Sequence, residues 1–220
     1  VKDTNGNTIS KYAYDPFGRR LWKEVNNLRT YFLYSDEGLI AEATGVGTLT
    51  KFYGYEPKSM WGTNPIYLKE GANYYFFQND HLGTAHKIIA PNGAVVWSAK
   101  IQAFGGTIVD AASSIVNNLR FGGQYYDQET DLHYNWHRYY DLKLGRYISG
   151  DPVGLRGGPN IYVYADNNVV NFFDATGRAP SGARSSGGSR SGNSGRNNNT
   201  QRNPSRRGPI DPGYRWPDDH

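Results

Sequence analysis

Two aspartates near the end of the regular part of the sequence have the type and spacing to do chemistry together. Asp151 and Asp174 stand 23 residues apart, and each begins a D-x-x-G sequence. Two carboxyl groups held close together resist ionising at the same time, so one keeps its proton near neutral pH. The ionised group can then activate a water molecule while the protonated group polarises a carbonyl. The alternative is that both are turn formers, because Asp is common at the first position of a β-turn.

The segment between the two aspartates has to bring them together for this chemistry. Residues 161–164, IYVY, are aromatic and β-branched, which predicts a short strand. If this strand lies between two turns that return to one sheet edge, both carboxyl groups reach that edge. The spacing permits a catalytic pair but does not by itself establish one.

The upstream sequence predicts an all-β fold built from successive antiparallel hairpins. Aromatic strands alternate with acidic-Gly turns at a spacing of roughly 20 residues, which indicates stacked strand pairs that bury a face only against their neighbours. The alternative is an ordinary antiparallel meander with a Tyr-rich surface. Residues 110–118 are expected to form a surface loop or a single helical turn. The predicted turns are at 4–7, 15–18, 36–38, 80–83 and 91–93.

The composition agrees with many short strands and excludes several kinds of site. The chain contains 18 Tyr, 9 Phe, 5 Trp and 27 Gly in 220 residues, a mixture typical of strands joined by turns. It contains no Cys, which excludes disulfides, cysteine nucleophiles and thiolate metal sites. No long apolar run predicts a membrane-spanning helix, and no leader with a basic start and an apolar centre predicts a classical signal peptide.

The net charge of +4 lies in the tail. Residues 179–220 contain seven Arg and three acidic residues, whereas the charges of residues 1–178 balance. The same tail lacks Leu, Val and Phe, so we predict that it is disordered. A flexible cationic tail can bind nucleic acid. A solvated linker is the preferred interpretation, and the folded part has no basic bias towards nucleic acid.

Four histidines are candidate metal ligands by spacing: His81 with His86, and His133 with His137. The second pair lies in an aromatic, strand-like run, where residues four apart are separated by about 13 Å. We therefore predict no metal site, and packing or hydrogen bonding against Tyr instead. No cofactor is expected.

Serine and glycine motifs give no further catalytic candidates. Ser113, Ser114 and Ser149 lack the G-x-S-x-G context of a serine hydrolase. The sequence GLRGG at 154–158 is similar to a phosphate loop only in glycine content and lacks the Lys-Ser/Thr pair, so it is predicted to be a turn.

Several longer strings resemble the Rhs/YD-repeat family and its Rhs-repeat-associated core. Residues 14–19, YDPFGR, are similar to a YD repeat. The resemblance implies a hollow β-shell of stacked hairpins around a variable C-terminal toxin, with a plug-like core and this chain as the last part of a larger shell. The core resemblance lies in NDHLGTAHKI (79–88), AVVWSAKIQAFGG (94–106), LRFGGQYYDQETDLHYNWHRYYDLKLGRYISGDPVGL (119–155) and GGPNIYVYADNN (157–168).

The resemblance also implies a reaction. In this family the core is an aspartyl autoprotease that releases the toxin inside the shell, and its end motif is D-P-x-G-L, a spacer and a second D-P-x-G-L. Matched by position, Asp151 and Asp174 are the implied catalytic pair and Arg178–Ala179 is the implied scissile bond. Arg178 stands where the family has Leu.

Further residues follow from the same match. Gly154 and Gly177 complete the two turns. Some relatives carry Arg directly before the first Asp, and Arg146 is the nearest candidate here because that position is Gly150. Two other departures are Ala175 in place of Pro and NNVV in place of NNP.

These expectations divide the chain into a YD-repeat strand region (1–118), an Rhs-repeat-associated core with the autoprotease motif (119–178) and a disordered tail (179–220). The implied function is a toxin-encapsulating shell end that cuts itself after Arg178. The alternative is a non-cleaving structural module for encapsulation or cell-surface interaction. The implied partners are its own C-terminal segment as cargo, secretion-system or toxin-complex components, and an immunity protein. The implied location is secreted or on the bacterial cell surface.

Overall fold

Antiparallel strands make up almost all of the regular structure. The computed structural model describes residues 1–178 and 180–182, and residues 179 and 183–220 lie outside the described part. The tail predicted to be disordered (179–220) therefore falls almost entirely outside it, but its residues Ser181–Gly182 form a short strand, which the prediction did not include. The predicted all-β class is confirmed: only two short 3-10 turns, η1 (Gly154–Gly157) and η2 (Ala165–Asn167), interrupt the strands described. The described residues form no helix with the length and apolarity of a membrane crossing.

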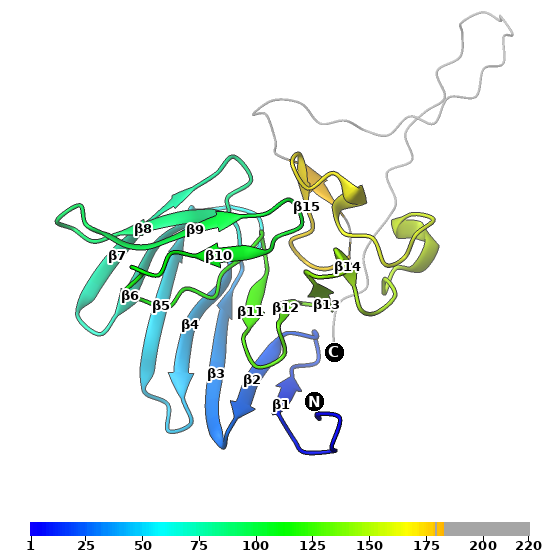
Figure 1. Cartoon of the computed structure of the whole chain (residues 1–220), viewed down its shortest axis with the longest axis horizontal. Helices are drawn as coiled ribbons and strands as arrows, with labels where there is room; N and C mark the ends of the chain where they lie inside the picture. Colours follow the sequence, from blue (N-terminus) through cyan, green and yellow to red (C-terminus); the bar gives the residue numbers. More distant parts are fainter. Residues whose placement is uncertain (179, 183–220) are drawn as a thin grey trace, which may run out of the picture. The chain divides into compact units, whose positions relative to one another are not determined.

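Ten strands form one sheet in which each strand pairs with the next in the sequence (Figure 1). This order needs only short hairpin connections, as the turn spacing predicts. The strands are β1 (Ser10–Tyr14), β2 (Arg20–Val25), β3 (Leu28–Ser35), β4 (Gly38–Thr44), β5 (Leu49–Tyr55), β6 (Pro65–Glu70), β7 (Asn73–Asn79), β8 (Ala85–Ile89), β9 (Val95–Ile101) and β10 (Thr107–Val109).

The D-x-x-G turns are closed by the aspartate side chain itself. Asp15 Oδ1 accepts hydrogen bonds from the backbone N–H groups of Phe17 (2.9 Å) and Arg19 (2.8 Å). Asp80 Oδ1 accepts in the same way from the N–H of Thr84, four residues on, at 2.9 Å. One carboxylate oxygen thus satisfies backbone donors that the hairpin ladder leaves unpaired, which explains why Asp begins these turns.

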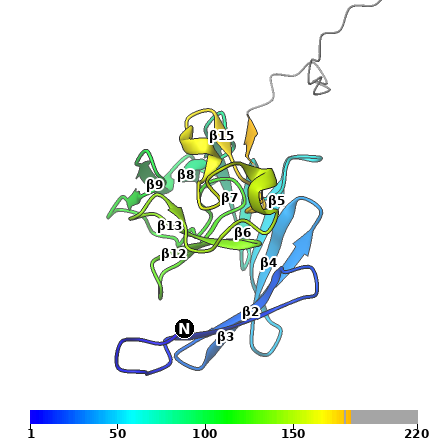
Figure 2. The ribbon, with the colours of Figure 1, turned by 90° about the vertical axis from the view of Figure 1, so that its right-hand side faces the viewer.

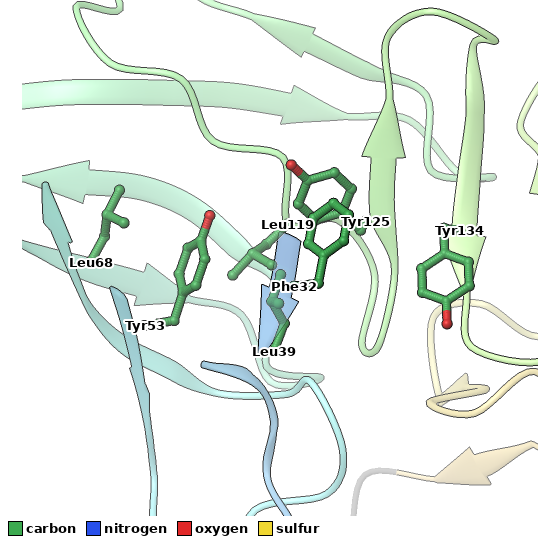
Figure 3. Close-up of a cluster of buried hydrophobic side chains, with 7 residues drawn as sticks. All are labelled: Phe32, Leu39, Tyr53, Leu68, Leu119, Tyr125 and Tyr134. Atoms are coloured by element: carbon green, nitrogen blue, oxygen red, sulfur yellow. The ribbon is translucent and has the colours of Figure 1, made fainter. Parts of the chain in front are cut away.

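One face of the sheet is buried and the other is exposed. Phe32, Tyr53 and Leu68 are at most 5% exposed and face inward, whereas Phe52 and Phe76 on the opposite face are 36% and 41% exposed. The inward side chains form a core with residues from the segment after the sheet (Figure 3). The cluster comprises Phe32, Leu39, Tyr53, Leu68, Leu119, Tyr125 and Tyr134.

After the sheet the chain crosses residues 110–118 as an irregular loop and then forms a second, four-stranded sheet (Figures 1 and 2). Its strands, again in sequence order, are β11 (Tyr125–Asp127), β12 (Leu132–Asn135), β13 (Arg138–Asp141) and β14 (Arg146–Tyr147). A last pair, β15 (Phe172–Phe173) and β16 (Ser181–Gly182), ends the described part.

The predicted strand at residues 161–164 is wrong. Only Val163 makes a bridge, to Arg146, and the residues around it are turns. Asn160 explains the difference, because its side-chain oxygen accepts from the N–H of Tyr162 (3.1 Å) and its carbonyl accepts from the N–H of Val163 (3.3 Å). Ala165 then continues with a positive φ of 48°, which ends any extended run. Asn-directed turns compete with strand formation in this way.

A buried ion pair joins the two sheets. Arg20 of β2 and Asp127 of β11 are both 0% exposed, and Arg20 Nη1 donates to Asp127 Oδ2. Lys23 Nζ lies 3.1 Å from the other oxygen of Asp127. The Arg20 guanidinium also lies over the rings of Phe32 and Tyr134, at 4.7 Å and 4.4 Å. Cation–π contacts of this kind offset part of the cost of burying the charge.

No side chain fits at Gly123, which lies just before β11 and packs against Ala175. Replacing Gly123 therefore tests the packing between these two segments. Its φ is +81°, and a Cβ there would lie 1.9 Å from the carbonyl oxygen of Ala175. We expect Gly123→Ala to lower the free energy of unfolding by at least about 2 kcal/mol, since the left-handed backbone and the overlap both cost energy. Urea denaturation measures the change. Gly71→Ala, with φ +58° and no atom within 4 Å, is the matched control. An equal loss of stability in both variants would show that the overlap with Ala175 does not contribute.

Candidate functional site: two aspartates on one arginine

Asp174 begins a turn of the same kind as those of the ten-stranded sheet. Its Oδ1 accepts a hydrogen bond from the backbone N–H of Arg178, four residues on, at 3.0 Å. This is the bond that Asp15 makes to Arg19 and Asp80 makes to Thr84. The turn occupies only one of the two carboxylate oxygens, so Oδ2 remains for other contacts.

Asp151 divides its oxygens in the same manner. Its Oδ1 accepts from the N–H of Val153 at 2.8 Å, and its carbonyl accepts from the N–H of Gly154 at 2.9 Å. Gly154 has a φ of +62°, which glycine adopts without strain. Both predicted aspartates are therefore turn formers through Oδ1, and both keep Oδ2 for a second role.

Arg138 of β13 joins these two second oxygens. Its Nη2 lies 2.9 Å from Asp151 Oδ2 and 3.0 Å from Asp174 Oδ2. The side chains of Arg138, Asp151 and Asp174 are 2%, 7% and 1% exposed. The two predicted carboxylates thus lie close together, because both contact the same nitrogen of Arg138. Arg138 was not among the site residues predicted from the sequence.

Arg138 also holds the backbone on both sides of the site. Its Nε donates to the carbonyl of Gly177 at 2.6 Å, and its Nη1 donates to the carbonyl of Ile161 at 3.1 Å. Its guanidinium lies 3.6 Å from the centre of the Tyr147 ring. One side chain therefore fixes the Asp151 turn, the Asp174 turn and the segment between them.

Tyr147 and Asn135 complete the surroundings of Asp174. The Tyr147 hydroxyl donates to Asp174 Oδ2 at 3.0 Å, and Asn135 Nδ2 donates to the Asp174 carbonyl at 2.7 Å. Burial, followed by the nearby charge of Asp174, raises the pKa of Tyr147 well above its usual value, so the phenol keeps the proton that it donates.

The predicted cleavage bond follows Arg178, between β15 and β16 in the sequence. In this last strand pair Phe172 pairs with Gly182 and Phe173 with Ser181. Arg178 is exposed, and Ala179 lies outside the described residues. Gly177 is tightly enclosed: its φ is +70°, and a Cβ there would lie 2.5 Å from the carbonyl oxygen of Asn135.

Arg146, the other predicted supporting residue, points elsewhere. It is exposed, pairs with Asp141 across β13 and β14, and lies 5.2 Å from the Tyr162 ring. The guanidinium between the carboxylates belongs to Arg138. An arginine was expected beside Asp151, but it is Arg138 of β13 and not the predicted Arg146 of β14.

Comparisons with known proteins agree with these features. The family model described as "RHS protein" matches residues 75–110. The chain is 31% identical over 210 residues to double-stranded DNA deaminase toxin A of Burkholderia cenocepacia, covering 83% of this chain and 15% of that protein. It is 40% identical over 106 residues to toxin protein Tse5 of Pseudomonas aeruginosa, covering 48% of this chain and 8% of Tse5. The chain belongs to the Rhs family.

Solved structures show the same fold at lower identity. The TcdB2-TccC3 crystal structure matches 80% of this Rhs chain and 10% of that chain, with a TM-score of 0.62 and 22% identity. The Tc holotoxin pore of Photorhabdus luminescens matches 82% of this chain and 10% of that chain, with a TM-score of 0.59 and 18% identity. The Rhs chain thus spans a small part of each of these proteins, and its strand arrangement is that of a Tc-toxin shell.

In the Rhs chain the electrostatics of the pair differ from those of two isolated carboxyl groups. In an isolated pair, repulsion between the two carboxylates alone would keep one proton in place. The structure instead places a positive charge in contact with both Oδ2 atoms, which lowers the cost of holding two acids together in a buried site. The same guanidinium touches the Gly177 carbonyl, one peptide before the predicted cleavage bond.

Arg138, Tyr147 and Asn135 were not among the site residues predicted from the sequence. Two of them could have been found from the sequence, because Asn135 and Arg138 are polar residues in an otherwise aromatic stretch. In the structure they pair across the two-residue turn between β12 and β13. Polar side chains buried in a strand pair need partners, and the carboxylate and the backbone carbonyls near Asp174 supply them.

The histidines have contacts within the protein. The described residues contain no group of three or more His, Asp or Glu that could hold a metal ion. His137 belongs to the turn between β12 and β13 and not to a continuous strand, so the expected strand geometry of the His133 and His137 pair does not apply. The partners are Gln124 for His133, the Thr176 carbonyl for His137, Asp80 for His86 and the Val170 carbonyl for His81.

Proposed function

We propose that this Rhs chain is the C-terminal part of a toxin-encapsulating shell that cuts itself once between Arg178 and Ala179. The observation that supports the proposal is the convergence of Asp151 and Asp174 on one buried guanidinium. Two turn-forming aspartates need no such meeting point, because their Oδ1 atoms already complete the turns. The parts of the chain are then a repeat region (1–118), a core (119–178) and a released segment (179–220).

The proposed step uses one carboxyl group in its protonated form and one in its ionised form. The ionised carboxylate takes a proton from a water molecule as the water oxygen attacks the carbonyl carbon of Arg178. The bond to the Ala179 nitrogen then breaks, and the protonated carboxyl group gives its proton to the leaving amine. With one proton on the pair, Arg138 balances its single negative charge before the attack. The charge then passes to the tetrahedral oxygen and returns to the pair when the second carboxyl group protonates the leaving amine.

Self-cleavage is tested on the full chain by denaturing gel, intact mass and N-terminal sequencing. We expect the wild-type chain to separate into two pieces, the second beginning at Ala179. Asp151→Asn and Asp174→Asn are expected to stay intact, because Asn can complete a turn but cannot exchange a proton. Asp110→Asn, which neutralises an exposed turn aspartate, is expected to be cut like the wild type. A wild-type chain that stays in one piece, unchanged by Asp151→Asn, rules out the proposed step.

The second candidate function is a structural latch without cleavage. It is favoured by the way in which Arg138 engages both carboxylates and the Gly177 and Ile161 carbonyls at once. A latch predicts an intact wild-type chain whose free energy of unfolding falls when either aspartate is replaced. Cleavage predicts an intact chain only in the variants.

We further propose that the segment after Arg178 is the cargo, and that the longer protein works in a secreted or cell-surface toxin assembly with an immunity protein in the producing cell. Support comes from relatives that are named as toxins and from the fold that is shared with Tc holotoxin components. Co-purification of toxin-complex or secretion-system components with the full-length protein tests this, and purification of the protein alone under mild conditions argues against it.

A further inference from the structure

Three arginines are buried in the described part of the chain, and one of them differs from the others. Arg20, Arg120 and Arg138 are 0%, 8% and 3% exposed. Arg20 is paired with Asp127, and Arg138 is paired with Asp151 and Asp174. Among the described residues, Arg120 has no carboxylate within ion-pair distance. Burying a guanidinium without a counter-ion is unfavourable, so the burial of Arg120 needs an explanation.

The contacts of Arg120 leave part of its guanidinium unused. Its Nη1 donates to the carbonyls of Asn117 and Leu119, at 2.8 Å and 2.9 Å. Its guanidinium lies 4.7 Å from the centre of the Tyr126 ring. Its Nε is buried and has no hydrogen-bond partner among the described residues. Burial lowers the pKa of Arg120 to about 10, as expected for a cation without a paired acid.

A second buried group beside Arg120 also lacks a partner. His133 is 1% exposed, and its Nδ1 lies 2.7 Å from the side-chain oxygen of Gln124, whereas its Nε2 has no partner among the described residues. Burial, followed by the charge of Arg120, lowers the pKa of His133 to about 3. The ring is therefore neutral, and with Nδ1–H donating to Gln124 its Nε2 is an acceptor.

Both side chains line one pocket of about 270 Å³ between the β10 edge and the four-stranded sheet. Thr107 and Tyr126 line it as well. Asp131 is the acid in its wall, but Lys143 lies 2.7 Å from that carboxylate and Tyr126 donates to it at 3.1 Å. The pocket wall thus has one cation in excess, Arg120, beside a neutral imidazole.

We propose that this pocket binds a small oxyanion such as hydrogen phosphate. The oxyanion accepts hydrogen bonds from the Arg120 guanidinium and supplies the counter-charge that this arginine lacks among the described residues. The same counter-charge can be supplied by a free anion or by the carboxylate of an acidic side chain. Within this chain, residues 183–220 contain Asp211, Asp218 and Asp219.

Binding is measured on the full chain by calorimetric titration with inorganic phosphate, with sodium chloride at equal ionic strength as reference. We expect saturable phosphate binding that is weaker by roughly tenfold or more in Arg120→Gln, because a charged hydrogen bond is lost. Arg156→Gln removes an exposed arginine and is expected to bind like the wild type. Equal binding to the Arg120→Gln and wild-type proteins, or equal responses to phosphate and chloride, overturns the proposal.

Imidazole nitrogen NMR of the wild type keeps the test independent of whether Arg120→Gln folds. Phosphate is expected to shift the His133 Nε2 signal and leave that of His86, which is paired with Asp80, unchanged. If phosphate binds only after Asp211, Asp218 and Asp219 are replaced by Asn, the anion is the chain's own carboxyl group. If phosphate moves neither signal in either protein, the pocket is not an oxyanion site.

Discussion

Asp127→Asn is expected to lower the free energy of unfolding by about 3–5 kcal/mol, because it leaves the buried Arg20 guanidinium without its counter-ion. Asp127 is fully buried and also pairs with Lys23 at 3.1 Å. Lys23 keeps Glu129 as a partner at 3.1 Å, so the loss falls mainly on Arg20. This pair joins β2 to β11, and its loss weakens the contact between the two sheets as well as the local hydrogen bond.

Urea denaturation followed by tryptophan fluorescence measures this change. Asp110→Asn is the matched control, since it removes one negative charge from an exposed turn. The Asn side-chain oxygen can still accept the hydrogen bond from the N–H of Ala112. We expect the control to unfold like the wild type, because exposed charges contribute little. A loss below about 1 kcal/mol for Asp127→Asn would indicate that the surrounding aromatic rings, not the carboxylate, hold Arg20 in place.

Arg138→Met is expected to cost a similar amount, about 3–5 kcal/mol, and to abolish any self-cleavage. The variant leaves the carboxylates of Asp151 and Asp174 buried side by side without a cation. It also leaves the carbonyls of Gly177 and Ile161 without the donors that now hold them. Met is similar in length, so the change in packing is smaller than the change in charge.

Urea denaturation measures the loss of stability in Arg138→Met. Arg156→Met, at an exposed arginine, is the control and is expected to unfold like the wild type. An equal loss in both variants would show that the buried charge of Arg138 is not the cause.

Turn chemistry and strand composition were enough to predict most of the fold. Asp15 and Asp80 mark hairpin turns because their side chains close them locally, so the sequence carries the full cause. The strand prediction for residues 161–164 is wrong because aromatic and β-branched residues also occur in irregular segments. Here hydrogen bonds to Asn160 determine the backbone. Strand propensity depends on neighbours that the local sequence does not contain.

The candidate site was only half predictable for the same reason. Asp151 and Asp174 are found by their repeated D-x-x-G context, which is local. Arg138 reaches them from strand β13, 13 residues before Asp151 in the sequence. Only tertiary packing decides that Arg138 and not Arg146 lies between them. Contacts of that kind depend on which face of a strand is buried. A shift of one residue in the strand register would turn each side chain to the opposite face.

Because β15 pairs with β16, cleavage of the bond after Arg178 would not by itself release the C-terminal segment. If the chain is cut after Arg178, the new end beginning at Ala179 is still held by the backbone hydrogen bonds between residues 172–173 and 181–182. The product is then a nicked, non-covalent complex that runs as two pieces on a denaturing gel and as one particle under native conditions. A pairing this short is weak on its own, so the lifetime of the complex depends on what else retains the released segment.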